Sequence, residues 1–358
     1  MRDTFIQARL NGITPPDREA MEGARLHWDA IAKPLHGLGR LEDMVVRIAG
    51  AAGTPEVRLD RKGVAVFCAD NGVVAQGVTQ SPSSVTAAVA GNLAAGRSSV
   101  CMMAKVARCR VVPVDMGILD FSGLPGLLDR RMGNGTQDIS VGPAMTRRQA
   151  EQAVLTGIEL VREQQEQGCR LLATGEMGIG NTTTSSAVAC MLLGRQVQEL
   201  TGRGAGLSDQ GLRRKIEVIR RAIAVNRPDP EDPLDVLSKL GGFDIAGLCG
   251  IFLGGALYGI PVLIDGVISS AAALCAERLC PNSAKAMVAS HVSQEPASRL
   301  LLEVLGKRPL ITAGMHLGEG TGAVAAIPLL DMALAVYQGS STFDETGIEA
   351  YQPLGGQP

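Results

Sequence analysis

Two glutamates stand inside glycine-rich segments, and each segment follows an apolar run that could form a strand. Glu176 lies in the segment Ala173–Thr184, which precedes a stretch compatible with a helix. Glu319 lies in the segment Gly314–Gly322, which follows the apolar run Pro309–Ala313. Ligands bind to open α/β sheets where strands end and helices begin, so the two carboxylates could meet at one sheet edge. Such a pair predicts acid–base chemistry, with different surroundings giving the two groups different roles.

The segment around Glu176 also predicts an anion site. A strand, a glycine turn and a helix start present backbone N–H groups to a phosphate. Gly178 and Gly180 allow close approach of the backbone, and the hydroxyls of residues 182–184 can donate hydrogen bonds or cap the helix. The third glycine of the dinucleotide fingerprint is missing, and no Lys precedes Thr182 as in a Walker loop. An ordinary tight turn is the alternative, and a carboxylate beside an anion is unfavourable unless it handles a proton or a cationic group.

Composition narrows the classes of function. The 358 residues carry 34 basic and 36 acidic side chains with no basic block, which argues against nucleic acid as the main partner. The eight cysteines form no CxxC pair, and the four histidines lack ligand spacing, so we expect reduced thiols and no metal site. Residues 1–4 do not begin an apolar leader, so we expect a cytoplasmic protein.

One uncharged stretch has the length of a membrane span. Ile245–Ile264 holds twenty residues without a charge, but five of them are glycines and one is a proline. We expect instead a helix at Ala246–Tyr258 followed by a buried strand at Pro261–Ile264. The sequence therefore predicts no membrane partner.

The elements that must position the glutamates alternate between strand and helix. We expect helices at Asp17–Ala32, Arg40–Ala51 and Thr146–Gln167, the last with Thr146 as its N-cap, and a helix at Pro82–Lys105 that is interrupted by Gly91 and Gly96. We expect an irregular stretch at Ser122–Pro143. Six apolar runs predict strands: Val64–Ala69, Arg110–Val114, Cys169–Ala173, Gly259–Ile264, Ala286–Ala289 and Pro309–Ala313.

Together these elements predict an α/β fold. The apolar runs are continuous, which predicts strands buried on both faces: an open, mostly parallel six-stranded sheet with helices on both faces. Residues 61–334 would form this catalytic domain. Residues 1–60 and 335–358 would pack together as a small helical domain.

Nearly every predicted strand ends in polar residues. In a parallel sheet these ends lie on one edge, which is the expected active site. Each acidic residue taken alone could equally be a helix cap or a turn residue. The set is Asp70, Asp115, Glu176, Asp265, Ser290, Ser293 and Glu319.

With these segments in view, the chain resembles the nicotinate-nucleotide–dimethylbenzimidazole phosphoribosyltransferase family over most of its length. The resemblance rests on the combination of the motifs, since single motifs are unspecific. They are Asp70–Val73, Gly77–Pro82 with Val85–Thr86, Val114–Gly117, Gly175–Thr183, Gly241–Ala246, Asp265–Gly266, Ser290–Glu295 and Leu317–Ala323.

The resemblance implies transfer of the phosphoribosyl group of nicotinate mononucleotide to 5,6-dimethylbenzimidazole or a related base, without a cofactor or metal. The products would be an α-ribotide and nicotinate, used in assembling the nucleotide loop of cobalamin. By resemblance Glu319 is the general base, and Glu176 is a second functional carboxylate near the ribose or the nicotinate.

The resemblance also implies the substrate contacts. The turn from Gly178 through Gly180, Asn181 and Thr182, together with Lys215 and Ser293, would bind the phosphate; for Lys215 the alternative is a solvated surface lysine. Asp265 is a further expected substrate contact. A flat, mostly apolar pocket for the base would involve Ser81, Met177 and Leu317.

The family implies a homodimer as well. The chain departs from its usual pattern at His36, where the family usually has Gly, and at Asn71, where many members have His. We assign no role to either residue. Two other hypotheses stay open: a non-catalytic nucleotide-binding partner subunit on the same fold, and a metal-dependent phosphosugar enzyme. The physiological base could also be adenine or a phenol.

Overall fold

The structure is a computed structural model that describes residues 5–351. Its centre is a six-stranded sheet with the order β3-β2-β1-β4-β5-β6, in which every neighbouring pair is parallel. The strands are β1 Lys62–Ala69, β2 Cys109–Gly117, β3 Leu128–Asp129, β4 Leu171–Met177, β5 Val262–Ile264 and β6 Met287–Ala289. The predicted α/β fold with a parallel six-stranded sheet is confirmed.

One predicted strand is wrong and another element takes its place. The run Pro309–Ala313 makes only an isolated bridge between Ile311 and His291, because both Leu310 and Ile311 donate to the same carbonyl of Ser290 before the chain turns away. The sixth strand is instead β3, which lies within the stretch 122–143 that was expected to be irregular. β3 has two exposed residues, so no apolar pattern marks it in the sequence.

Helices cover both faces of the sheet, as expected. In β1 the side chains of Ala65 and Phe67 enter one hydrophobic core and those of Val64 and Val66 enter the other. The first core holds the helices α6 Arg147–Glu166, α7 Asn181–Leu193, α9 Asp209–Asn226, α10 Pro233–Leu240, α11 Phe243–Tyr258, α12 Val267–Leu279 and α13 Ala297–Val304. The second holds α2 Arg18–Ala30, α3 Arg40–Ala52, α4 Ser84–Ala94, α5 Ser99–Val106 and α14 Thr321–Gly339.

The remaining elements are short. They are α1 Phe5–Leu10, α8 Val197–Leu200, α15 Phe343–Thr346 and the 3₁₀ helices η1 Gly72–Gln76 and η2 Pro281–Ala286. The predicted helix over residues 82–105 is divided into α4 and α5, because Gly96 adopts a φ of +68° between them. Thr146 caps α6 with a capping box, as predicted.

Small residues let α6 and α11 pack with their backbones in contact. A Cβ added to Gly157 would lie 2.0 Å from the carbonyl oxygen of Gly247, and one added to Gly250 would lie 2.0 Å from that of Val154. The uncharged stretch 245–264 thus divides into buried α11 and β5, as predicted. Within residues 5–351, α14 is the one helix long and apolar enough to span a membrane, and half of its apolar window is buried inside the protein.

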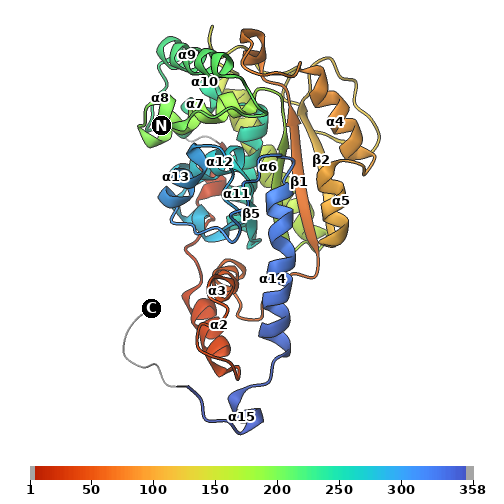
Figure 1. The fold of residues 1–358 in the computed structure, drawn as a ribbon, viewed down its shortest axis with the longest axis vertical. Coiled ribbons are helices and arrows are strands. Elements are labelled where there is room, and N and C mark those ends of the chain that lie inside the picture. The colour runs from red at the N-terminus through yellow and green to blue at the C-terminus, as the bar shows by residue number, and fades with distance from the viewer. Residues whose placement is uncertain (1–4, 352–358) are drawn as a thin grey trace.

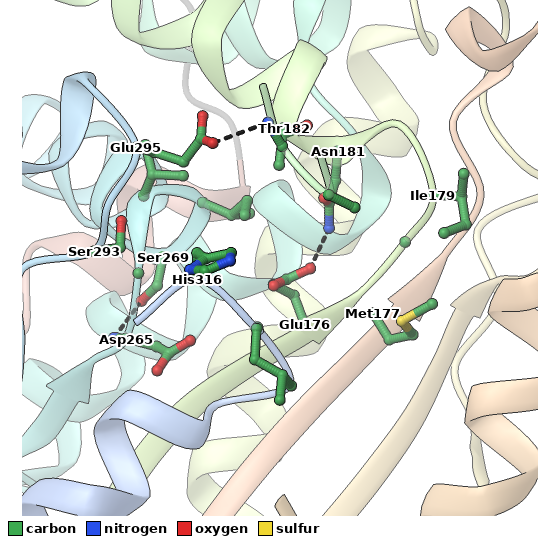
Figure 2. Close-up of a pocket in the computed structure, with 18 of the residues that line it drawn as sticks. Glu176, Met177, Ile179, Asn181, Thr182, Asp265, Ser269, Ser293, Glu295 and His316 are labelled. Atoms are coloured by element: carbon green, nitrogen blue, oxygen red, sulfur yellow. Dashed lines mark hydrogen bonds between the residues drawn. The ribbon is translucent and has the colours of Figure 1, made fainter. Parts of the chain in front are cut away.

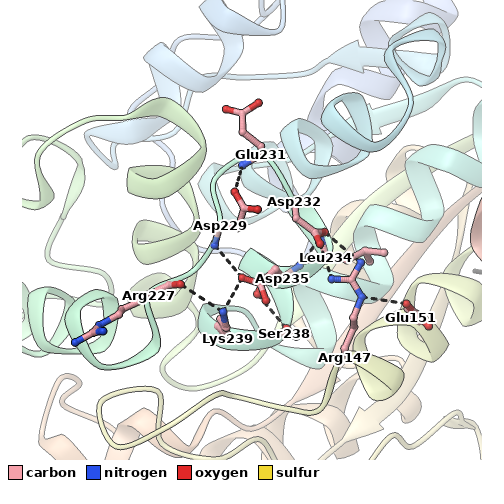
Figure 3. Close-up of polar contacts among 10 residues, drawn as sticks. All are labelled: Arg147, Glu151, Arg227, Asp229, Glu231, Asp232, Leu234, Asp235, Ser238 and Lys239. Atoms are coloured by element: carbon pink, nitrogen blue, oxygen red, sulfur yellow. Dashed lines mark hydrogen bonds and ion pairs between the residues drawn. The ribbon is translucent and has the colours of Figure 1, made fainter. Parts of the chain in front are cut away.

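Polar contacts join α10 to α6 just before α11 begins (Figure 3). Arg147 of α6 pairs with Asp232, which caps the N-terminus of α10. Within α10, Asp235 pairs with Lys239 one turn later. The Arg147–Asp232 pair thus ties the start of α10, which leads through Gly241 into α11, to α6.

Helices α2 and α3 from the N-terminal part of the chain lie beside α14 from the C-terminal part. Figure 1 shows α2 and α3 next to the end of α14 that lies farther from the sheet, with α15 beyond it. Trp28 packs edge-on against Tyr337, and Ile31 forms an antiparallel bridge with Thr342. α1 instead packs on α6 and α11. The division of the chain at residues 60 and 335 stays a prediction.

Candidate active site

A cavity of about 280 Å³ lies at the carboxyl ends of β4, β5 and β6 (Figure 2). Ten of the twelve predicted site residues line it: Ser81, Glu176, Met177, Gly178, Gly180, Asn181, Thr182, Asp265, Ser293 and Leu317. Lys215 and Glu319 stand just outside its lining. The sheet edge chosen from the sequence is therefore the edge that carries the cavity.

The glycines of the turn after β4 are required by close contacts and by backbone conformation. A Cβ on Gly178 would lie 2.3 Å from the carbonyl oxygen of Ala69. Gly180 has a φ of +94°, which is in the left-handed region, and it precedes the first residue of α7. Thr86 anchors the turn, because its hydroxyl accepts a hydrogen bond from the N–H of Ile179 at 3.2 Å. This geometry directs the N-terminus of α7 at the cavity.

Glu176 is the buried carboxyl group of the cavity. Its side chain accepts a short hydrogen bond from the amide of Asn181, as the dashed line in Figure 2 shows. The pKa of Glu176 is raised to about 8, chiefly by desolvation and next by the negative charge of Asp244. At pH 7 this group is therefore mostly protonated and can donate a hydrogen bond.

Asp244 lies behind Glu176 at the start of α11 and is fully buried. Its Oδ2 accepts a second N–H from Asn181 at 3.2 Å, and its Oδ1 accepts the N–H of Ile245 at 2.9 Å. Burial raises the pKa of Asp244 to about 6, against the opposing effect of these donors. Asn71, one of the departures from the family pattern, also reaches this layer, donating to the carbonyl of Ile179 at 3.4 Å.

Lys215 is buried, so the alternative of a solvated surface lysine is wrong. Its ammonium donates to the hydroxyl of Thr182 at 2.8 Å, and its side chain has no exposed area. Desolvation lowers the pKa of Lys215 to about 8, while the charge of Glu295 acts in the opposite direction. Glu295 lines the cavity and accepts the N–H of Gly204 at 2.9 Å. A cation next to the first turn of α7 suits an anionic group.

Asp265, Ser293 and His291 form the opposite wall. Asp265 accepts the N–H of Ala323 at 2.8 Å and faces the ring of His291, with 3.9 Å between Oδ1 and Nδ1. Burial raises the pKa of the Asp265 carboxyl group, and the facing His291 opposes this. The hydroxyl of Ser293 is buried and has no hydrogen-bond partner among the described residues, so it is free to bind a ligand.

Glu319 adopts a conformation that the sequence did not predict. It has a φ of +61°, and its N–H donates to the carbonyl of Glu176 at 3.1 Å. Its carboxylate accepts the N–H of Val100 in the first turn of α5 at 3.1 Å. The two glutamates are thus neighbours, but the carboxylate of Glu319 is turned toward α5 and away from the cavity lining. A non-glycine residue at such a φ stores strain of about 1–3 kcal/mol, which is common at functional sites.

Three contacts of the site were missed in the sequence: Asp244, His291 and Thr86. Asp244 had a usable signal, because it is the one charged residue at the start of an otherwise uncharged helix. His291 and Thr86 had none beyond their motifs, because their roles depend on contacts between distant segments. Within the described part of the chain, no group of three or more His, Cys, Asp or Glu side chains is placed to hold a metal ion.

Comparison with known proteins gives consistent results. Residues 13–348 match a family model described as phosphoribosyltransferase. A nicotinate-nucleotide–dimethylbenzimidazole phosphoribosyltransferase of Ruminiclostridium cellulolyticum is 46% identical over 351 residues, covering 98% of this chain and 99% of the relative. A protein of the same name from Acetivibrio thermocellus is 46% identical over 344 residues, covering 96% and 98%. The crystal structure of CobT from Thermus thermophilus superposes with a TM-score of 0.88 at 40% identity, covering 93% of this chain and all of the other.

Proposed function

The chain belongs to the nicotinate-nucleotide–dimethylbenzimidazole phosphoribosyltransferase family, and we propose how its cavity performs that transfer. The phosphoribosyl group of nicotinate mononucleotide passes to 5,6-dimethylbenzimidazole or a related base, giving an α-ribotide and nicotinate for the nucleotide loop of cobalamin. One observation carries the proposal: a single cavity is lined by Glu176 and apolar walls, with a buried lysine at a helix N-terminus and a second, neighbouring glutamate just outside its lining.

The phosphate binds at the α7 end of the cavity. The ammonium of Lys215, the hydroxyl of Thr182 and the N-terminus of α7 supply donors there, and the unpartnered hydroxyl of Ser293 adds a donor from the opposite wall. Each of these groups is anchored by the fold, so little ordering is left for the ligand to impose. Glu176 is compatible with this anionic ligand because its carboxyl group is mostly neutral at pH 7.

The base binds between Met177, Leu317 and the segment that begins at Ser81, where Val85 and Ile179 add apolar surface. A bicyclic aromatic ring fits such a mostly apolar space. One ring nitrogen attacks C1 of the ribose from the face opposite nicotinate. The C1–N bond to nicotinate breaks, its electron pair stays on the pyridine nitrogen, and nicotinate leaves as a neutral ring.

Glu319 removes the remaining proton from the attacking imidazole. Its place next to Glu176, just outside the cavity lining, supports this role, as does the strain in its backbone. For the transfer, its carboxylate leaves the N–H of Val100 and rotates toward the base. A carboxylate base is sufficient, because the imidazole becomes acidic as it forms the new bond.

The variant Glu319→Gln tests this assignment. We expect nicotinate release to fall by about 10²–10⁴-fold, with binding of nicotinate mononucleotide retained. Ser98→Ala, next to the same end of α5, is the matched control and should leave release within about threefold of the wild type. Near-wild-type turnover of the glutamine variant would exclude Glu319 as the base. No release even from the wild type would favour the alternative, a non-catalytic nucleotide-binding subunit.

We further propose that the enzyme is a homodimer that works in the cytoplasm. Helices α5 and α14 contact each other, and each carries an exposed apolar side chain: Val106 is 81% exposed, and Met332 is 56% exposed. All eight cysteines are unpaired, as in a reducing compartment. Light scattering should give twice the 37.3 kDa of one chain, and Val106→Asp should give the single-chain mass.

A further inference from the structure

A chain of three buried polar side chains connects the cavity to the interior. Asp244 comes from α11, Asn181 from α7 and Glu176 from β4. The amide nitrogen of Asn181 donates to Oδ2 of Asp244 at 3.2 Å and to Oε2 of Glu176 in a shorter contact. The three residues are 0%, 6% and 7% exposed, so bulk water screens them poorly. Two carboxyl groups therefore share one neutral donor group in a desolvated place.

The number of protons that Glu176 and Asp244 hold together follows from the donors available to them. An amide group has two N–H bonds, and here one serves each carboxyl group. Two ionised carboxylates around one neutral amide would repel each other strongly at low dielectric. A single proton held by the pair removes this repulsion, as in other close carboxyl pairs.

Asp244 is the partner that holds the charge. Its Oδ1 accepts the N–H of Ile245 in the first turn of the sixteen-residue helix α11, where the helix dipole favours an anion. Gly178 and Gly242 leave it space, since a Cβ on either would come within 3.0 Å of its carboxylate oxygens. The pKa values of about 6 for Asp244 and about 8 for Glu176 agree with this order.

We propose that Asp244 is a positioning residue for the transfer reaction, and this inference rests on the proposed function. Through Asn181 it orients the carboxyl group of Glu176, and its buried charge keeps the proton on that group in the free enzyme. Glu176 then presents a hydroxyl donor, and not a negative charge, to the incoming nucleotide. This resolves the conflict of a glutamate inside an anion site.

Other ionisable groups face the chain and bear on any pH profile. The negative charges of Asp265 and Glu319 raise the pKa of Glu176. The negative charge of Asp70 raises the pKa of Asp244. Burial raises the pKa of the nearby Cys68 thiol, and the charges of Glu176 and Asp244 add to this increase. On the cationic side, His291 faces Asp265, and Lys215 loses its proton near pH 8.

The variant Asp244→Asn tests the proposal through the pH dependence of kcat/KM for nicotinate mononucleotide, which reports the free enzyme. In the wild type both Glu176 and Lys215 lose a proton near pH 8, so log kcat/KM should fall with a slope of two above that pH. In the variant, Glu176 ionises at least ~1 pH unit lower. The fall then begins below pH 7 with a slope of one, and kcat/KM at pH 7.5 drops by about 3- to 10-fold relative to its own plateau.

Two further variants locate the effect. In a Glu176→Gln background the same Asp244→Asn change should leave the alkaline limb unmoved, because the titrating group is gone. Asn181→Ser removes the donor that favours ionised Glu176, so it should move the Glu176 step above pH 8, opposite to Asp244→Asn. This variant also carries the test if Asp244→Asn does not fold.

A matched control separates charge from lost stability. Glu42 is also buried, in α3 away from the cavity, and is paired with Lys33 at 2.9 Å. Glu42→Gln should lower the melting temperature and leave the alkaline limb where it is in the wild type. An unchanged limb in Asp244→Asn, or an equal shift in the Glu176→Gln background, would overturn the proposal. Absence of nicotinate release from the wild type at any pH would instead reject the proposed function.

Discussion

The buried ammonium of Lys215 should make the free enzyme less stable than it could be. The group is fully buried and has one hydrogen bond, to Thr182. Its pKa falls to about 8 from 10.5, chiefly through desolvation. Each pKa unit corresponds to 1.36 kcal/mol, so burying the charged form costs about 3 kcal/mol at pH 7. We therefore expect Lys215→Met, which keeps the length of the side chain, to stabilise the protein.

The expected gain follows from two opposing contributions. Removing the charge relieves about 3 kcal/mol, and losing a charge-assisted bond to Thr182 costs about 1.5 kcal/mol. The net increase in the free energy of unfolding is about 1–2 kcal/mol, or roughly 2 °C in melting temperature for a chain of this length. The pH dependence has a definite sign. Because the unfolded chain binds the proton up to about pH 10.5, the penalty is complete below pH 8 and is relieved as the pH rises from 8 to 10.5.

Thermal unfolding with and without nicotinate mononucleotide measures both the stability of the free enzyme and the stabilisation that the ligand adds. A ligand at 100 times its Kd stabilises the wild type by about 2.7 kcal/mol. Lys215→Met should lose about 1.3–2.3 kcal/mol of this gain at the same ligand concentration, because a missing charged donor weakens phosphate binding by roughly 10- to 100-fold. Lys239→Met, which removes a partly exposed lysine paired with Asp235 (Figure 3), is the control and should alter neither value. A Lys215→Met protein with unchanged stabilisation by ligand would refute the phosphate assignment, and one that melts at a lower temperature would refute the burial argument.

Two further variants test how the cavity is supported. Gly250→Ala should lower the free energy of unfolding by about 3 kcal/mol or more, because its Cβ would lie 2.0 Å from the carbonyl of Val154 and would force α6 and α11 apart. The control is Gly91→Ala, in a helix position with free space. It should change the free energy of unfolding by less than ~1 kcal/mol in thermal unfolding. Thr86→Val should raise the KM for nicotinate mononucleotide by a larger factor than it lowers kcat. The reason is that the N–H of Ile179 loses its acceptor and the glycine turn loosens. Thr86→Ser keeps the hydroxyl and should restore the wild-type KM, and a failure of this rescue would contradict the assigned role.

The sheet and its functional edge could be predicted from the sequence because both follow from local pattern. Buried parallel strands such as Val64–Ala69 give continuous apolar runs, and the residues that follow them must share one edge. β3 could not be predicted, because its two residues are exposed and pair with β2 only through the tertiary fold. Pro309–Ala313 has the composition of a strand, but the position of Ser290 limits it to a single bridge.

The site was predictable in its residue types and not in its internal arrangement. The glycine turn after Glu176 and its hydroxyls predicted an anion site from residue types alone, and these residues line the cavity. The burial of Lys215 could not be inferred, because helix α9 gives no sign of which of its basic residues faces the cavity. The turning of Glu319 toward Val100 and the connection from Asp244 to Glu176 depend on contacts between segments more than 60 residues apart.

The most direct test of the account is a product assay with nicotinate mononucleotide and 5,6-dimethylbenzimidazole in the presence of a metal chelator. Free nicotinate and the new ribotide are measured together, and the anomer of the ribotide is determined. The account predicts one nicotinate released for each α-ribotide formed, with release dependent on the added base. No release with benzimidazoles, adenine or phenols, or release that proceeds without any base, would contradict it.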